Sequence, residues 1–143
     1  MSVEIHIVQE ATNELVESLN HLLAQLSKSA TPLSIERVSK IIESSAVTLF
    51  AAQIDQDVIG TLTLVVFPIP SGLRAWIEDV VVDVTARGTG AGAALTSAAI
   101  EMARQRGARS IDLTSRPSRT AANGLYVKLG FELRKTNVYR LSL

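Results

Sequence analysis

Apolar residues recur at helical spacing in the first part of the chain, after one short run with strand character. The run predicts a strand over Val3–Val8. Leucines then recur every three or four residues and predict a helix over Asn13–Leu26. Ser34 can cap a second helix, whose apolar face would include Val38 and Ile42. The N-terminal third is therefore predicted to form one strand followed by two amphipathic helices.

The pattern changes after Ala46 to long runs rich in β-branched and aliphatic residues. Three strands are predicted, over residues 47–54, 58–67 and 73–84. Asp55–Asp57 and Pro68–Gly72 supply the turns between them. Strands joined by such short turns form an antiparallel meander.

Helices and strands alternate in the remaining third. A helix is predicted over Gly90–Arg106, with Gly107 as its C-terminal cap, and a short strand follows over Ser110–Thr114. Ser118 can cap a further helix that runs to about Lys128 and is terminated by Gly130. Two final strands are predicted over Phe131–Arg134 and Val138–Leu143. With no repeat or linker in between, residues 1–143 are predicted to form a single α/β domain with a mixed sheet.

Composition limits the chemistry. The 14 basic and 14 acidic residues give a net charge of zero, without the basic surplus typical of nucleic-acid binding. The absence of cysteine excludes disulfides, thiolate metal sites and a cysteine nucleophile, and the two histidines form no metal-ligand pattern. No apolar run reaches the roughly 20 residues that a bilayer requires, and we read no signal peptide. We therefore expect a cytoplasmic protein with no membrane partner.

A glycine-rich loop carries the main functional signal. Three glycines alternate beside Arg87 in the segment Arg87-Gly-Thr-Gly-Ala-Gly92, between a predicted strand and a predicted helix. A helix N-terminus binds phosphate through free backbone N–H groups, and glycines allow the phosphate to approach. No acidic residue occurs between Asp83 and Glu101 to repel an anion. The segment also fits the dinucleotide pattern G-x-G-x-x-A, with Asp112 at a suitable distance, but residues 83–87 separate its first glycine from the strand.

Three motifs together resemble the GNAT superfamily of N-acetyltransferases. Arg87, Gly90 and Gly92 meet the pattern Q/R-x-x-G-x-G/A. Residues 82–84 stand where the family has V-x-P, with a valine in place of the proline, and residues 123–131 match N-x-x-Y-x-x-x-G-F. The resemblance covers most of the chain from about Ala46 and extends more loosely to the two N-terminal helices. It implies a mixed, mostly antiparallel central sheet flanked by helices on both faces, and acetyl-CoA as the cosubstrate.

The resemblance assigns cofactor contacts to two segments and one asparagine. The backbone N–H groups of Arg87, Gly88, Thr89, Gly90, Ala91 and Gly92 would hold the pyrophosphate of coenzyme A. The end of the preceding strand, at Val80, Val81 and Val82, would pair with the pantetheine arm, and one of its N–H groups would polarise the thioester carbonyl. Asn123 would touch the cofactor beside the thioester.

Two residues are candidates for proton transfer. The resemblance makes Tyr126 the acid that protonates the departing thiolate, although its apolar neighbours also fit a core position. The run Ile77-Glu78-Asp79 resembles that of the amino-sugar phosphate N-acetyltransferases, and this resemblance makes Glu78 the preferred base or water-relay anchor for the amine. Alternation along a strand predicts that Glu78 and Asp79 face opposite sides, and the open alternatives are that both pair with arginines or that water alone takes the proton. Trp76 shares the face of Glu78 and would wall the acceptor pocket or lie in the core.

These features lead to one function and its rivals. We expect direct transfer of an acetyl group from acetyl-CoA to a primary amine in a ternary complex, with a small molecule or a protein as acceptor. The rivals are a non-catalytic acyl-CoA sensor and a dinucleotide-binding domain. Arg116, Arg119 and Lys128 would meet cofactor phosphates or an acidic substrate, or form a solvated helix face. The final strands would leave a sheet edge to be covered, which favours a homodimer.

Overall fold

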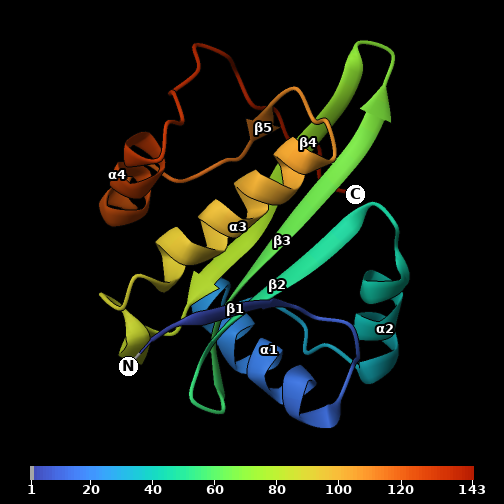
Figure 1. The fold of residues 1–143 in the computed structure, drawn as a ribbon, viewed down its shortest axis with the longest axis vertical. Helices are drawn as coiled ribbons and strands as arrows, with labels where there is room; N and C mark the ends of the chain where they lie inside the picture. The colour runs from blue at the N-terminus through green and yellow to red at the C-terminus, as the bar shows by residue number, and fades with distance from the viewer. Residues whose placement is uncertain (1) are drawn as a thin grey trace.

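A five-stranded sheet forms the centre of the computed structural model, which describes residues 2–143 (Figure 1). The strand order is β1-β2-β3-β4-β5, and only the last pair is parallel. The elements in chain order are β1 Glu4–Ile7, α1 Asn13–Leu26, α2 Ile35–Glu43, β2 Val47–Ile54, β3 Asp57–Ile69, β4 Gly72–Val82, the 3₁₀ helix η1 Val84–Ala86, α3 Ala91–Gln105, β5 Ile111–Asp112 and α4 Thr120–Lys128. The predicted mixed α/β architecture is confirmed. Within residues 2–143, no helix is long and apolar enough to cross a membrane.

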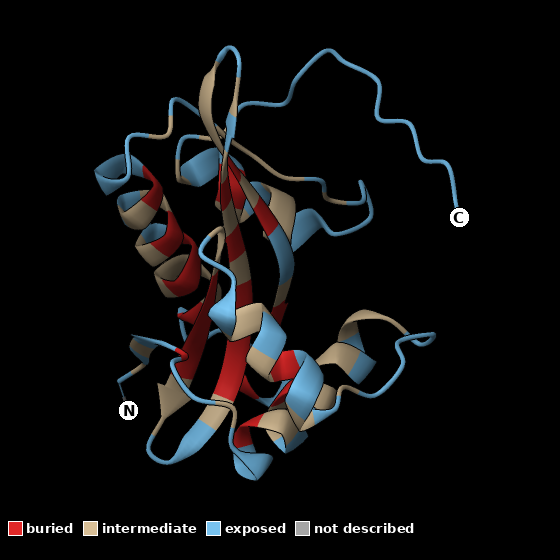
Figure 2. Cartoon of the chain, turned by 90° about the vertical axis from the view of Figure 1, so that its right-hand side faces the viewer, coloured by how far each residue is buried: buried red, intermediate tan, exposed pale blue. Residues whose placement is uncertain are grey.

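Helices cover both faces of this sheet, as alternation along the strands requires. Phe50 and Ala52 of β2 point into the cluster beneath α3, which contains Leu95. Leu49 and Ala51 point the other way, into a cluster with Leu19 and other residues of α1 and α2. Successive strand residues face opposite sides, so one strand serves both cores. Figure 2 shows buried residues along the strands and on the inward sides of the helices.

The last two sheet strands separate soon after they meet. β4 and β5 pair only at Ala75↔Ile111 and Trp76↔Asp112, whereas β4 continues to Val82. From Ile77 onward, the edge of β4 on that side has no neighbouring strand. The gap that this opens in the sheet positions the candidate site.

A β-bulge lies in β4 at the start of this gap. Two steps along β3, from Thr61 to Thr63, correspond to three steps along β4, from Val81 to Glu78. Asp79 lies inside the bulge with a φ of 50°. The extra residue bends the strand and changes which side its side chains face.

The predicted C-terminal strands are not formed. Residues 131–143 contain no strand, and the chain after α4 makes no hairpin. Alternating apolar residues give this segment β-propensity, but a strand also needs a partner for its backbone groups, and this segment runs away from the sheet (Figure 2). The predicted Ser118 cap is also wrong, because α4 begins at Thr120 with Arg119 at its cap position and no side-chain cap bond.

Candidate functional site

An open cleft of about 1130 Å³ lies where β4 and β5 diverge. Its walls come from four parts of the chain that are distant in sequence. They are the end of α1 at residues 25–27, β4 at residues 77–82, the loop and first turn of α3 at residues 86–93, and the segment from β5 into α4 at residues 113–126. Arg140 also lines the cleft. Most predicted site residues therefore meet in one place.

The glycine-rich loop presents the N-terminus of α3 to this cleft. Gly90 occupies the cap position with a φ of 87°, a left-handed conformation that side chains disfavour. Thr89 turns away and donates its hydroxyl to the Ala86 carbonyl at 2.6 Å, which holds the loop. The first turn of α3 contains no acidic residue, so its free N–H groups at Ala91 and Gly92 form an anion-binding end.

The open edge of β4 faces the same cleft. Val80, Val81 and Val82 all line the cavity, beyond the last pairing of β4 with β5. A strand edge without a neighbour offers backbone N–H and C=O groups to an extended ligand. The loop that suits phosphate and the edge that suits an extended chain are thus adjacent.

Glu78 and Asp79 both belong to the part of β4 that borders the cleft, whereas a regular strand was expected to turn their side chains to opposite sides. The expectation assumed regular alternation, whereas Asp79 lies in the bulge with a positive φ. Among residues 2–143, neither carboxylate forms an ion pair, so the predicted alternative of arginine partners is not realised in this structure. Trp76 donates its indole N–H to Glu78 at 2.5 Å and orients that carboxylate from outside the cavity wall.

Tyr126 is both a packed aromatic residue and a cleft residue. Only 6% of it is exposed, and its ring meets Phe131 edge-on with centroids 5.7 Å apart. Burial raises the pKa of the phenol above its usual value, and the positive charge of Arg119 acts in the opposite direction. The phenol is therefore protonated at neutral pH and available as a donor at the cleft.

Four arginines line the cleft: Arg87, Arg116, Arg119 and Arg140. Within the described part of the chain, none of them has an acidic partner within 4.0 Å. Together with the N-terminus of α3 they make this cavity favourable for an anion, whereas Glu78 and Asp79 place negative charge on β4. Lys128 does not line the cleft.

A buried hydroxyl in the cleft wall has no partner. Ser115 Oγ is excluded from solvent and, among residues 2–143, makes no hydrogen bond. Such a group is costly unless a ligand satisfies it. Asn123, by contrast, is not in the cavity wall and donates to the Arg116 carbonyl at 2.9 Å, which closes the loop before α4. The sequence contained no signal for Ser115, since it belongs to none of the motifs.

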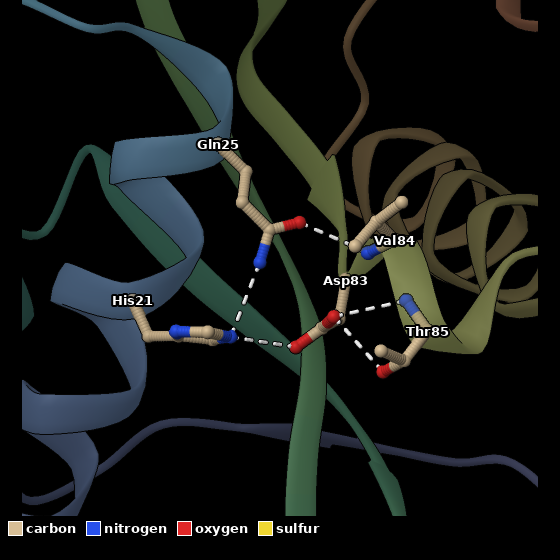
Figure 3. A network of polar contacts seen from close by, with 5 residues as sticks. All are labelled: His21, Gln25, Asp83, Val84 and Thr85. Carbon is tan, nitrogen blue, oxygen red and sulfur yellow. Dashed lines mark hydrogen bonds and ion pairs between the residues drawn. The ribbon is translucent and has the colours of Figure 1, made fainter.

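A polar network ties α1 to the start of the glycine-rich loop (Figure 3). His21 Nε2 lies 2.9 Å from Asp83 Oδ2, and Val84 donates its backbone N–H to Gln25 Oε1 at 2.9 Å. Asp83 also accepts from the backbone N–H and the hydroxyl of Thr85, both at 3.0 Å. Gln25 Nε2 lies 3.2 Å from the same His21 nitrogen.

Whether His21 Nε2 carries a proton decides whether it bonds to Asp83 or to Gln25. Val84 fixes the amide of Gln25, so Gln25 Nε2 can only donate to a lone pair on His21. Asp83 needs a proton on that same nitrogen, and the two bonds exclude each other. The bond to the carboxylate is shorter and charge-assisted, so it prevails. The hydrogen bonds to Thr85, first of all that of its backbone N–H, and then the contact with His21, lower the pKa of Asp83.

Asp112, the acid that the dinucleotide pattern would require, interacts with two arginines. Asp112 accepts from Arg74 at 2.6 Å and lies 4.0 Å from Arg134. Among residues 2–143, the structure also contains a single strand–helix–strand unit with parallel pairing, between β4 and β5. Neither feature suits recognition of a ribose by the Rossmann arrangement.

Solved structures share this fold over the whole chain. A transcriptional regulator from Bacillus halodurans is 29% identical, with a TM-score of 0.81 and 99% of each chain covered. An acetyltransferase from Trypanosoma brucei is 27% identical, with a TM-score of 0.80, over 99% of this chain and 100% of the other. An aminoglycoside acetyltransferase from an uncultured soil metagenomic sample, in complex with trehalose, is 18% identical and similar in fold, with a TM-score of 0.86 over 99% and 95% of the two chains.

Sequence comparison gives the family. No curated protein matches the chain. The model of the acetyltransferase (GNAT) family matches residues 14–131, a range that includes the glycine-rich loop, both cleft carboxylates and Tyr126. The chain therefore belongs to the GNAT acetyltransferase family.

Proposed function

We propose that this chain is an acetyl-CoA-dependent N-acetyltransferase that passes the acetyl group directly to a primary amine. One observation carries the proposal: the anion-binding N-terminus of α3 and the unpaired edge of β4 border the same cleft. A ligand that joins a pyrophosphate to an extended amide chain matches both features. Acetyl-CoA is such a ligand.

The residues present fit both ends of this ligand. At the phosphate end, the N–H groups of residues 87–92 and the side chain of Arg87 would hold the pyrophosphate. At the pantetheine end, the edge of β4 at Val80–Val82 offers backbone pairing. The unpartnered hydroxyl of Ser115 offers one more hydrogen bond to the amide chain. Asn123 reaches the ligand only by giving up its bond to Arg116.

The reaction requires two proton transfers around one acyl transfer. The amine nitrogen attacks the thioester carbonyl carbon, a C–N bond forms, and the C–S bond breaks with the electrons moving to sulfur. A β4 backbone N–H stabilises the negative charge that develops on the carbonyl oxygen. Glu78, directly or through water, accepts the proton of the amine, and Tyr126 gives a proton to the thiolate. The chain contains no cysteine that could carry the acetyl group.

The acceptor is expected to be a cationic primary amine. Glu78 and Asp79 provide the negative charge among the residues that line the cleft, and both belong to β4. A protonated amine would be drawn to these carboxylates before it loses its proton. Small-molecule amines and protein amines both meet this condition, so the acceptor screen should contain aminoglycosides, polyamines and peptides with a free N-terminus.

Calorimetric titration with acetyl-CoA tests the cofactor site. Wild type should bind acetyl-CoA and should not bind NAD(H) or NADP(H). Gly90→Glu should abolish binding, because it places a carboxylate at the anion-binding end. Gly107→Glu is the matched control: Gly107 has a φ of 83°, its Cβ position is open like that of Gly90, and it lies outside the cleft. Equal losses in both variants, or binding of a nicotinamide cofactor, would contradict the proposal.

Ser115→Ala tests the pantetheine end with a change that introduces no strain. Loss of one hydrogen bond to a buried group should weaken binding of acetyl-CoA by about 1 kcal/mol, roughly five- to tenfold. An unchanged affinity would show that this hydroxyl does not meet the ligand. A chain that binds acetyl-CoA but acetylates no amine in the screen would favour the acyl-CoA sensor instead.

A further inference from the structure

The carboxylate of Glu78 depends on one contact for its direction. Trp76 Nε1 donates to Glu78 Oε2 at 2.5 Å, and among residues 2–143 this carboxylate makes no other hydrogen bond and no ion pair. Glu78 is itself exposed. An exposed glutamate otherwise samples several rotamers, because fixing such a side chain costs conformational entropy. The direction of the Glu78 carboxylate at the cleft therefore rests on the indole of Trp76.

Regular strand geometry places these two side chains next to each other. Trp76 and Glu78 are two residues apart on β4, in a stretch where the register against β3 is regular. Side chains two residues apart on a strand point to the same face. The bulge begins only after Glu78, so it displaces Asp79 and leaves the Trp76–Glu78 pair intact. The two carboxylates of β4 thus differ, since only that of Glu78 has a donor beside it.

Trp76 is placed to act as a rigid support. In the described chain it is the last residue of β4 that is paired on both sides, with Val65 of β3 and Asp112 of β5. Asp112 is held in turn by Arg74, whose Nη2 lies 2.6 Å from Asp112 Oδ2. Glu78 lies two residues further on, where β4 no longer has β5 as a neighbour. The indole bond therefore connects the open edge of β4 to the part of the strand that is fixed on both sides.

The support comes from outside the cleft. Glu78 lines the cavity, whereas Trp76 does not. Ala75 and Ile77 belong to the cluster beneath α3, so the residues that alternate with them, Trp76 and Glu78, start from the other face of the sheet. The indole can hold the carboxylate without occupying the space that acetyl-CoA and the amine need.

The bond also decides which oxygen of Glu78 is left for the reaction. An indole N–H can only donate, so Oε2 is its acceptor and Oε1 remains for the proton of the amine. A hydrogen bond to a carboxylate is charge-assisted and stronger than one between neutral groups. A base held in this way needs no reorientation when the amine arrives, and displacing a catalytic group by about 1 Å can cost on the order of 100-fold in rate.

We propose that Trp76 is a positioning residue, which holds Glu78 by Oε2 and leaves Oε1 to accept the proton of the amine. The inference rests on the proposed acetyl transfer, in which Glu78 is the base. It assigns the effect of Trp76 to kcat, through Glu78. A wall of the acceptor pocket would act on the acceptor KM instead, and a core residue would act on stability alone.

Nuclear magnetic resonance tests the bond without any reaction. Trp76 is the one tryptophan of the chain, so its indole gives a single N–H signal. Glu78→Ala should shift this signal and speed its exchange with solvent, because the acceptor is lost. Asp79→Asn is the control: it removes the neighbouring charge, tolerates the positive φ and should leave the exchange rate unchanged. A signal that Glu78→Ala does not change, or that both variants change equally, would overturn the proposal.

Steady-state kinetics separates positioning from binding. Trp76→Phe keeps an aromatic ring but has no N–H, so it should lower kcat about tenfold or more and leave the acceptor KM within about twofold. Val65→Ala is the matched control, because it truncates the residue opposite Trp76 on β3 but keeps the indole N–H, and it should keep kcat. A higher acceptor KM at unchanged kcat in Trp76→Phe, or an equal loss of kcat in both variants, would contradict a positioning role.

A double variant shows whether Trp76 acts through Glu78. In a Glu78→Ala chain, Trp76→Phe should cause no further loss of kcat, because the carboxylate that the indole positions is already absent. A further loss as large as that of Trp76→Phe alone would mean that Trp76 acts on another group, and the inference would be wrong. If wild type acetylates no amine, the proposed function fails, whereas the indole signal still decides whether Trp76 holds Glu78.

Discussion

Two aspartates have positive φ angles, and they differ in what surrounds them. Asp55, with φ of 55°, lies in the turn between β2 and β3, and Asp79, with φ of 50°, lies in the bulge of β4 at the cleft. Aspartate tolerates the left-handed region better than most residues but is still less stable there than glycine. The two positions thus carry similar strain, and of the two only Asp79 lines the cleft.

Replacing each aspartate by glycine separates strain from function. Asp55→Gly and Asp79→Gly should each raise the free energy of unfolding by up to about 1 kcal/mol, because the strain is relieved, although the added freedom of the unfolded chain offsets part of the gain. Urea titration measures this change. Only Asp79→Gly should alter kcat or the acceptor KM, since it removes a cleft carboxylate. Activity that falls equally in both variants would mean that Asp79 has no role of its own.

Tyr126 allows a second test at the residue scale. Tyr126→Phe should keep the edge-on contact with Phe131 and leave the affinity for acetyl-CoA unchanged, since only the hydroxyl is removed. Loss of the acid should lower kcat about 100-fold or more. Because burial raises the pKa of this phenol, wild-type kcat should show no loss from its ionisation below about pH 10. Single-turnover kinetics and calorimetry give both numbers, and an unaltered kcat would assign the thiolate proton to water.

Helices and strands were predicted correctly where a long stretch of consecutive sequence carried a clear pattern of apolar residues. The helix over Asn13–Leu26 and the strand over Val47–Ile54 were predicted with the observed bounds, because the helix buries a regularly spaced apolar face and the strand is a continuous apolar run buried on both sides. The glycine-rich loop was also placed correctly between β4 and α3. The bulge at Asp79 was not predicted, since nothing in the Ile-Glu-Asp-Val run marks an extra residue in the ladder.

Contacts between distant elements were also beyond prediction from the sequence. His21 and Asp83 are 62 residues apart, and nothing in the sequence around either residue indicates that the two side chains meet. The predicted strands over Phe131–Arg134 and Val138–Leu143 failed for a related reason. Strand propensity is a property of the segment alone, but a strand forms only where an adjacent strand supplies hydrogen-bond partners for its backbone groups.

The His21–Asp83 contact links α1 to the start of the glycine-rich loop and makes that link sensitive to acid. The pKa of Asp83 is lowered in the folded chain, so its carboxylate stabilises the fold above its unfolded pKa of about 3.9, and this stabilisation is lost as pH falls through the lower folded value. Asp83→Asn keeps an acceptor for the Thr85 N–H but loses the charge. It should lower Tm at pH 7 by a few degrees, and the difference from wild type should shrink below about pH 4. Thermal melts at pH 7 and pH 3.5 test this, and a difference that is constant with pH would contradict it.

At the scale of the whole molecule, the sheet is shared by two apolar clusters. Leu95 on α3 is fully buried on one face, and Leu19 on α1 is 4% exposed on the other. The strands between them contribute alternate side chains to both clusters, so neither cluster can persist once the sheet is lost. The glycine-rich loop depends on this arrangement for its position, because β4 and α3, the elements that it joins, both contribute residues to the cluster that contains Leu95.

Leu95→Ala and Leu19→Ala should therefore destabilise a single cooperative unit. Each should lower the free energy of unfolding by about 2–5 kcal/mol, the usual cost of truncating a buried leucine. Trp76, the one tryptophan of the chain, reports on β4 by fluorescence, and far-ultraviolet circular dichroism reports on the helices. In urea, the two signals should change together in wild type and in both variants. If circular dichroism fell before fluorescence in Leu19→Ala, α1 and α2 would unfold as a separate unit, and the shared sheet would not couple the two faces.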